Sequence, residues 1–175
     1  GGLFVRASGR VEISNVVVVD NSGDGITVEG YSEDVLIENV TVLGNGGDGI
    51  YLDAYDGDIV NVTIRNVTIR NNAGYAIGGR WYFPYYYVTN ITVNEGIIIE
   101  NNGGGIYLGC DGSVVIGNFD VVDTPGYGVY ISGDADNVLI QNMTIRNNSD
   151  GGLFVRASGR VEISNVVVVD NSGDG

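Results

Sequence analysis

The chain has 175 residues, enough for one domain with a sizeable core, and its 22 acidic residues against 8 basic ones give a net charge of −14. This charge repels nucleic acid and anionic lipid surfaces, and no apolar run reaches the roughly 18 residues of a membrane span. We therefore expect neither nucleic-acid binding nor membrane insertion. The one cysteine, Cys110, excludes an internal disulfide and a Cys/His zinc site.

The sequence repeats itself at long range. Residues 1–25 recur without a change as residues 151–175. Identity over such a length indicates a tandem array. The sequence therefore predicts two parts, one complete unit over residues 1–150 and the first part of the next, identical unit over residues 151–175.

A shorter period lies inside the unit. A Gly-apolar-x-apolar motif begins at Gly2, Gly25, Gly49, Gly105, Gly128 and Gly152, and Ala76 takes the place of the glycine in the fourth copy. The unit thus divides into six segments, here called coils, with a mean length of about 25 residues. Val and Ile dominate the apolar residues, and the 29 glycines serve tight turns, so we expect strands and almost no helix.

Each coil carries three short segments in which apolar and polar residues alternate. These segments are residues 3–5, 11–13 and 16–18 in the first coil, 26–28, 35–37 and 40–42 in the second, and 129–131, 138–140 and 143–145 in the sixth. Period-two alternation places the apolar side chains on one face of each strand. A single coil cannot bury that face, but stacked coils can. The sequence predicts an all-β parallel β-helix with three short parallel sheets.

Polar residues recur in register with the apolar ones. One series stands just before the third strand of its coil and comprises Asn15, Asn39, Asn66, Asn118 and Asn142, with Glu95 in the fourth coil. A second series follows that strand and comprises Asn21, Asn45, Asn72, Asn101 and Asn148, with Thr124 in the fifth coil. Stacked Asn side chains can hydrogen-bond along the stack, so we expect two structural ladders.

Some asparagines also satisfy the Asn-x-Ser/Thr acceptor pattern for N-glycosylation. Asn39, Asn66 and Asn142 belong to the expected ladders, and their amides should be blocked. The candidates that remain, in a host that glycosylates, are Asn61, Asn90 and Asn147.

The turn after the first strand collects acidic residues, of which Asp53, Asp56 and Asp58 lie closest together. Carboxylates on a turn suit calcium, whereas the simpler interpretation is a solvated acidic face; no other cofactor is indicated. The same turn of the first coil holds arginines. We expect Arg6 and Arg10, and at the seam between units their copies Arg156 and Arg160, to supply positive charge to the acidic turn. At the seam, Asp134 and Asp136 precede these copies, and the acids of the middle coils have no such partner.

The fourth coil is lengthened by an aromatic segment. Its aromatic residues include Trp81, Tyr82, Phe83, Tyr85 and Tyr86. Such a loop can fold back over apolar surface, pack against a neighbouring fibre or stack on sugar rings. All three interpretations stay open at this stage.

The coil pattern, as in GITVEGYSEDVLIENVTVLGNGGD over residues 25–48, resembles the right-handed parallel β-helix repeats of the pectate-lyase-like superfamily. The resemblance covers the whole chain and implies the fold; its members range from polysaccharide lyases and hydrolases to structural solenoids. Related hydrolases use clustered Asp with a His, and this chain has no His. Its Arg65, Arg70 and Arg146 occupy outward positions of repetitive strands. We do not expect an enzyme.

These observations favour a structural extracellular or cell-surface filament of stacked units, whose partner is another copy of itself, end to end and laterally. The alternatives are a carbohydrate-binding or carbohydrate-active β-helix, with glycans as partners, and an adhesin stalk. A continuous stack requires the repeated segment to extend the core. We expect six residues to do so, namely Leu153, Val155, Val161, Ile163, Val166 and Val168.

Overall fold

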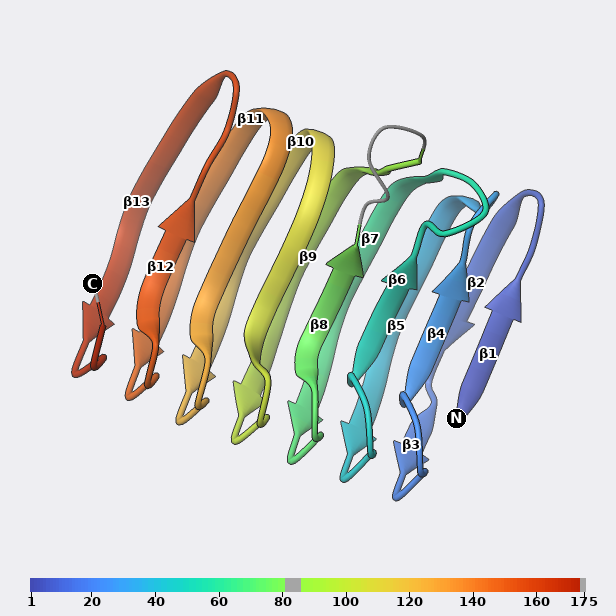
Figure 1. Cartoon of the computed structure of the whole chain (residues 1–175), viewed down its shortest axis with the longest axis horizontal. Coiled ribbons are helices and arrows are strands. Elements are labelled where there is room, and N and C mark those ends of the chain that lie inside the picture. Colours follow the sequence, from blue (N-terminus) through green and yellow to red (C-terminus); the bar gives the residue numbers. More distant parts are fainter. Residues whose placement is uncertain (81–85, 174–175) are drawn as a thin grey trace.

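The computed structural model describes residues 1–80 and 86–173, and every regular element among them is a β-strand. The chain winds into an elongated stack of about 7 coils, each lying on the one before it (Figure 1). The strands are β1 (Leu3–Arg6), β2 (Arg10–Ser14), β3 (Val17–Val19), β4 (Ile26–Glu29), β5 (Glu33–Leu43), β6 (Ile50–Asp53), β7 (Ile59–Arg70), β8 (Tyr75–Arg80), β9 (Val88–Ile99), β10 (Gly104–Val122), β11 (Tyr127–Arg146), β12 (Gly151–Val155) and β13 (Arg160–Val169).

Neighbouring coils pair their strands in parallel and in register. On the first face of the stack, β1, β4, β6 and β8 follow one another and continue into the first residues of β10 and β11 and into β12. Ile50, for example, lies between Ile26 of the preceding coil and Ile77 of the next. The predicted all-β parallel β-helix, with coils of about 24 residues, is confirmed. Within the described residues, no helix could cross a membrane.

The second and third faces are joined by corners of a single residue. Asn39, Asn66 and Glu95 each adopt a φ of 50–61° in the middle of β5, β7 and β9. The left-handed region is costly for most residues but less so for Asn, whose side chain hydrogen-bonds locally. Each strand therefore turns the corner without leaving the hydrogen-bonded ladder, which is why β5, β7 and β9 span two faces.

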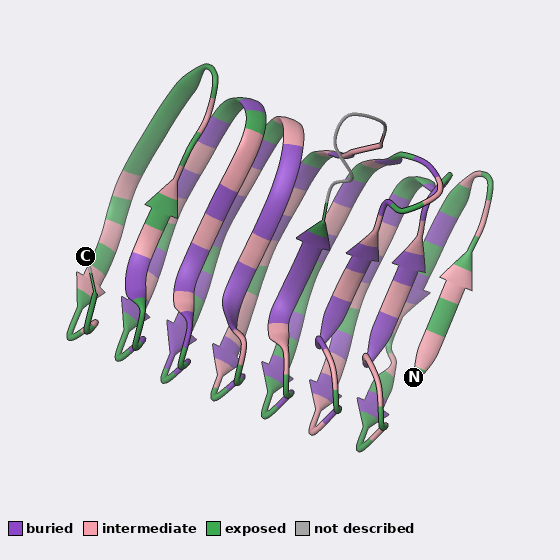
Figure 2. Ribbon diagram, viewed as in Figure 1, coloured by how far each residue is buried: buried purple, intermediate pink, exposed green. Residues whose placement is uncertain are grey.

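The core runs along the inside of the stack as columns of like residues. Val and Ile side chains at alternate positions are buried, and Figure 2 shows the purple bands recurring from coil to coil. The first and last coils are covered on one side alone. Val11 and Ile13 are 4% and 5% exposed, whereas the identical residues Val161 and Ile163 of the last coil are 43% and 49% exposed. Burial therefore depends on a coil being stacked above.

The repeated segment extends this core. Strand β11 pairs with β12 and β13, so that Leu153 lies opposite Val129, and Ile163 opposite Ile140. The other four residues likewise lie opposite core residues of the sixth coil: Val155 opposite Ile131, Val161 opposite Val138, Val166 opposite Met143 and Val168 opposite Ile145. The prediction that the six residues continue the core columns is confirmed.

Cys110 is buried in this core. Burial, together with the nearby charge of Asp111, raises the pKa of its thiol to about 12. The reactive form of cysteine is the thiolate, and this thiol stays protonated up to that pH.

We therefore expect Cys110 to resist iodoacetamide in the folded protein at pH 8 and to react within minutes in denaturant. Mass spectrometry of the intact chain before and after unfolding measures the alkylated fraction. Rapid alkylation of the folded protein would contradict the burial of this residue.

Candidate functional site

The outer surface of the first face carries a column of aromatic side chains, here called the aromatic face. The column follows the register of the strands and comprises Phe4, Thr27, Tyr51, Gly78, Tyr107, Tyr130 and Phe154. Period-two alternation turns each of these residues outward because its neighbours in the strand enter the core. Five of the seven positions are therefore aromatic and lie on one straight line along the stack.

The rings in the last coils stack face to face. Tyr107 and Tyr130 have ring centroids 4.9 Å apart at 3°, and Tyr130 and Phe154 are 4.5 Å apart at 9°. Tyr75, at the start of β8, adds a further ring 4.8 Å from Tyr107. Such pairs contribute about 0.5–1.5 kcal/mol each beyond the area that they bury. The column thus stabilises the stack and also presents an exposed aromatic surface.

Charged residues flank the aromatic column two positions further along the strands. Arg6 lies 3.6 Å from Glu29 and 3.1 Å from Asp56, two coils away. Asp53 follows Glu29 in the register, and Arg80 follows Asp53. The Arg80 guanidinium lies 5.6 Å from the ring centroid of Tyr51, within the range of a cation–π contact.

Asp48 is the most deeply buried acid of this region. One carboxylate oxygen accepts the backbone N–H of Tyr75 at 2.7 Å, and the other lies over Gly78, where a Cβ would collide with it. Burial raises the pKa of Asp48; the Tyr75 N–H and Arg80 oppose the rise, and Asp24 adds to it. The folded state therefore binds this proton more tightly than the unfolded chain does.

Because the folded pKa is raised, the contribution of Asp48 to the free energy of unfolding falls as pH rises from about 3.8 through the raised value. Asp48→Asn keeps the acceptor for Tyr75 and removes the titration. We expect this variant to gain stability relative to wild type between pH 4 and pH 7, measured by urea unfolding at both. Asp136→Asn, the same charge change on an exposed residue, serves as control. An equal gain in both variants would contradict this role of Asp48.

The structure separates the three acids predicted to bind calcium. Asp56 pairs with Arg6, and the Asp58 carboxylate accepts the backbone N–H of Tyr87 at 2.8 Å. Burial is the main cause that raises the pKa of Asp53. Among the described residues, no group of three or more acidic, His or Cys side chains is arranged to hold a metal ion. Calcium binding therefore stays a prediction without a preformed site.

Of the arginines expected to supply positive charge to the acidic turn, Arg6 does so by pairing with Asp56, whereas Arg10 and Arg160 pair elsewhere. Arg160 pairs with Glu162 of its own strand at 2.6 Å, as Arg10 pairs with Glu12 at 2.8 Å. Within residues 1–80 and 86–173, no ion pair joins Arg156 or Arg160 to Asp134 or Asp136. An outward Arg side chain instead follows its strand or reaches across coils, as Arg6 does to Asp56. The acids of the middle coils are therefore not without a positive partner.

Four residues of the predicted aromatic loop, Trp81, Tyr82, Phe83 and Tyr85, lie outside the described residues. Tyr86 is described: it is half-buried and packs against the core. Its contact agrees with a chain that folds back over the flank, one of the three interpretations.

The inner asparagine ladder forms along the inside of the third corner. Nδ2 of each residue donates to Oδ1 of the next coil, from Asn21 to Asn45 at 2.9 Å, Asn45 to Asn72 at 2.8 Å, Asn72 to Asn101 at 2.9 Å and Asn148 to Asn171 at 2.8 Å. Thr124 replaces Asn in the fifth coil, and its hydroxyl donates to Asn148 at 2.7 Å. The glycine of the coil motif leaves room for this ladder: a Cβ on Gly128 would lie 2.8 Å from Nδ2 of Asn148.

The outer series also forms hydrogen bonds, at the corner between the second and third faces. Asn66 donates to Asn39 at 2.6 Å, and Asn142 donates to Asn118 at 3.2 Å. Asn15, the first of the series, adopts the same corner conformation with φ 56°. In the fourth coil Asn94, not Glu95, accepts the amide of Asn118 at 2.7 Å.

The three candidate glycan acceptors lie in further ladders, contrary to our expectation that they stand outside them. Asn61 donates to Asp34 at 3.0 Å, Asn90 to Asn61 at 3.3 Å and Asn147 to Asp123 at 3.0 Å. All three adopt a positive φ because they form corners of the coil, like the series already predicted. Their amides are therefore engaged but exposed, and their glycosylation stays a prediction.

The side chains of the inner ladder should contribute much more to the free energy of unfolding than the exposed side chains next to them. Asn101 accepts the N–H and the Nδ2 of Asn72 and donates to the carbonyls of Ile69 and Ile99, and three of these four bonds are fully buried. We expect Asn101→Ala to lower the free energy of unfolding by about 2–4 kcal/mol because it leaves buried groups unpaired. Asn102→Ala, at the exposed neighbour, should change it by less than about 0.5 kcal/mol. Equal effects in urea unfolding would refute the ladder's role.

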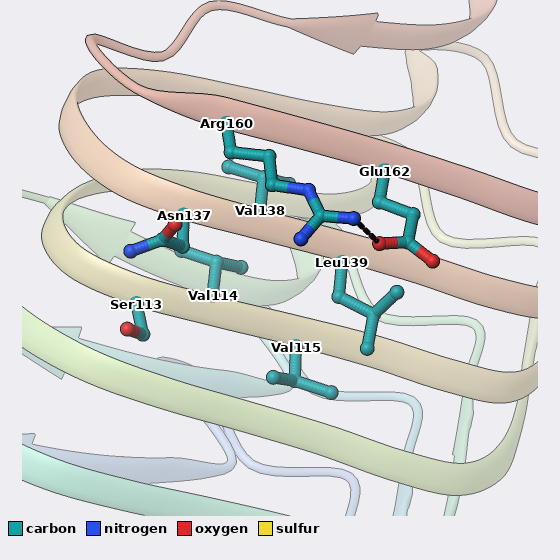
Figure 3. Close-up of a pocket in the computed structure, with 8 residues that line it drawn as sticks. All are labelled: Ser113, Val114, Val115, Asn137, Val138, Leu139, Arg160 and Glu162. Carbon is teal, nitrogen blue, oxygen red and sulfur yellow. Dashed lines mark hydrogen bonds and ion pairs between the residues drawn. The ribbon is translucent and has the colours of Figure 1, made fainter.

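A shallow hollow of about 240 Å³ lies on the second face near the seam. Figure 3 shows Val115 and Leu139 along its floor and the Arg160–Glu162 pair at its edge. Its lining combines four aliphatic residues with Ser113, Asn137 and the ion pair, and offers no group of converging polar side chains among the residues drawn. We regard the aromatic face as the stronger candidate.

Comparison with protein families identifies the fold. The family model described as "Right handed beta helix region" matches residues 1–82 and 37–175. The chain therefore belongs to the right-handed β-helix family, which agrees with the resemblance seen in its coil pattern. Comparison with the sequences of curated proteins gives no match.

Two solved structures share the architecture. The crystal structure of the periplasmic alginate epimerase AlgG superposes with a TM-score of 0.80 at 14% identity, covering 96% of this chain and 42% of the epimerase. A single-residue variant of that enzyme gives a TM-score of 0.70 at 14% identity, with 95% and 42% covered. This chain thus spans less than half the length of both, and at such low identity the likeness shows the fold alone.

Sequence reasoning missed the aromatic face and Asp48. A signal for the face was present, since the position between the two apolar residues of the coil motif holds Phe4, Tyr51, Tyr107, Tyr130 and Phe154. Asp48 stands directly before Gly49 of the motif, and its carboxylate lies over Gly78 of the fourth coil. That contact crosses coils of different length and could not be read along the chain.

Proposed function

We propose that this chain is a segment of the β-helical shaft of an extracellular or cell-surface filament, built from tandem copies of the 150-residue unit. The observation that carries the proposal is the seam between the sixth coil and the repeated segment. A copy of the first coil lies on the sixth coil with the same parallel pairing that joins all other coils.

Backbone hydrogen bonds cross this seam at ordinary lengths. The N–H of Arg156 donates to the carbonyl of Ile131 at 2.9 Å, and the N–H of Ser172 donates to Asn148 at 3.0 Å. Comparable bonds join the first two coils, where the N–H of Leu3 donates to Gly25 at 2.8 Å. A solenoid whose last coil accepts its first can be prolonged without a special junction.

The exposed core of the last coil supports the same proposal. Val161 and Ile163 are half exposed because no coil covers them, whereas Val11 and Ile13 are covered by the second coil. Burying such side chains contributes about 1.5–3 kcal/mol each. In a tandem array, the unit that begins at residue 151 continues with a coil that matches the second coil in sequence. That coil would cover these residues as residues 26–48 cover the first coil.

Length and stiffness would be the function of such a shaft, and a stalk that spaces an adhesive head from a surface is a special case of it. The neighbouring epimerase is described as periplasmic, which agrees with a place outside the cytoplasm. We do not assign catalysis to the shaft, because the chain has no His and four acids of the aromatic face, Asp24, Glu29, Asp48 and Asp56, are engaged with Arg, backbone N–H or hydroxyl groups.

Adding one 150-residue unit in front of the chain tests this proposal. We expect one continuous rod that is longer by roughly 29 Å, since six coils advance about 4.8 Å each. We also expect one cooperative unfolding transition at a higher temperature, because interfaces between repeats add stability. Small-angle X-ray scattering and calorimetry measure the two quantities.

A matched control is the same extended array with Ile140→Asp in each sixth coil. Ile140 lies opposite Ile163 across the seam, so a buried charge there should break the stack. Two separately tumbling bodies in the unsubstituted array, or two transitions that match the single unit, would contradict the shaft.

A further inference from the structure

The aromatic column has one open gap. Between Phe4 and Tyr51 the register places Thr27, whose side chain is much smaller than a ring. A hollow of about 380 Å³ lies at this point. It is lined by Gly1, Leu3, Phe4, Gly23, Asp24, Thr27, Tyr51 and Asp53.

The width of the gap follows from the stack. Rings in adjacent coils of this column lie 4.9 and 4.5 Å apart. Phe4 and Tyr51 stand two coils apart, so their rings are separated by roughly 9–10 Å. A flat six-membered ring placed midway would lie about 4.5–5 Å from each, which is the spacing of stacked rings. The gap therefore has room for one ring.

The second small residue of the column does not leave such a gap. Gly78 lies between Tyr51 and Tyr107, but the Arg80 guanidinium covers one ring and Tyr75 stacks on the other. The Asp48 carboxylate lies over Gly78 itself. The space at Gly78 is therefore filled by side chains of the protein itself, whereas the gap at Thr27 is open.

The groups around the open gap define what it would accept. The Asp24 carboxylate already accepts the Thr27 hydroxyl at 3.3 Å and the Asp48 N–H at 2.8 Å. Asp53, which pairs with Glu29 in the register, also lines the hollow. Among the described residues, Oδ1 of Asp53 is a buried oxygen without a hydrogen-bond partner, and its carboxylate borders the hollow. These oxygens accept hydrogen bonds and repel anions. A ligand with apolar faces and hydroxyl groups at its rim fits this arrangement, whereas a carboxylated sugar does not.

We propose that Phe4 and Tyr51 hold one neutral hexopyranose ring of a polysaccharide between them, with Thr27 as the floor and Asp24 and Asp53 accepting its hydroxyl groups. Pyranoses with equatorial hydroxyls present apolar C–H faces to the two rings and donors to the two carboxylates. In a tandem array the gap recurs once in each unit, since every unit brings its own Phe4, Thr27 and Tyr51. The site stands whether or not the array forms a filament.

Filling the gap tests the proposal on the full chain. Thr27→Tyr supplies the missing ring and should stack between Phe4 and Tyr51 without loss of stability. We expect it to weaken binding of cellohexaose at least tenfold in isothermal titration calorimetry. Thr68→Tyr makes the same change at an exposed outward position of β7 and should bind as wild type does. Unchanged binding by Thr27→Tyr overturns the proposal.

A second pair of variants uses the sequence repeat. Phe4→Ala removes one wall of the gap, whereas Phe154→Ala removes the identical residue of the last coil, which has no Tyr51 two coils beyond it in this chain. We expect at least a tenfold loss of affinity in the first variant and less than a twofold change in the second. Equal losses would place the ligand elsewhere on the aromatic face and would overturn the proposed site.

Comparing a neutral with an anionic oligosaccharide tests which chemical class of sugar the site binds. Wild-type protein should bind cellohexaose and should bind an oligogalacturonate of the same length at least tenfold more weakly. Absence of cellohexaose binding up to about 10 mM would overturn the proposal, as would equal or tighter binding of the oligogalacturonate. Neither result bears on the length of the rod in the extended array, so failure of the sugar site and failure of the shaft are distinguishable.

Discussion

Stacking in register is the constraint on which this structure depends. Parallel pairing at one strand spacing places nearly every side chain against its counterpart in the next coil, so a residue type is favoured when it packs well against itself. Val and Ile form core columns, Asn forms ladders, and Tyr and Phe form a stack. Stacked like charges repel each other, as Glu29 and Asp53 do, and Arg6 beside Glu29 offsets part of this repulsion.

The same constraint explains the corners. A coil that turns by a single residue needs a left-handed conformation at that residue, and the residue must also meet its counterpart above. Asn satisfies both conditions, as Asn39 and Asn66 show, and it does so at more than one corner of the coil. The inner ladder adds a third condition, since Asn45, Asn72, Asn101 and Asn148 bring polar amides into the interior and satisfy them with one another.

The core columns and the inner ladder could be predicted because both follow from a period along the chain. The contacts of the arginines could not, since Arg6 reaches Asp56 two coils away and Arg160 turns to Glu162 of its own strand. Asn61 and Asn90 belong to a further corner column, whose Asp and Asn residues do not recur in every coil and so give no clear period along the chain. The gap at Thr27 depends on the sizes of the side chains in neighbouring coils. It could not be predicted from the coil motif, because the motif distinguishes only apolar from polar positions.

Continuity across the seam is the central claim, and amide hydrogen exchange of the full chain tests it most directly. The account predicts that the amides of Arg156, Ser158 and Ser172, which donate to backbone carbonyls of the sixth coil, exchange far more slowly than in an unfolded chain and open together with the neighbouring strand β11. Exchange of these amides at the rate of an unstructured peptide, with β11 still protected, would contradict the continuous stack.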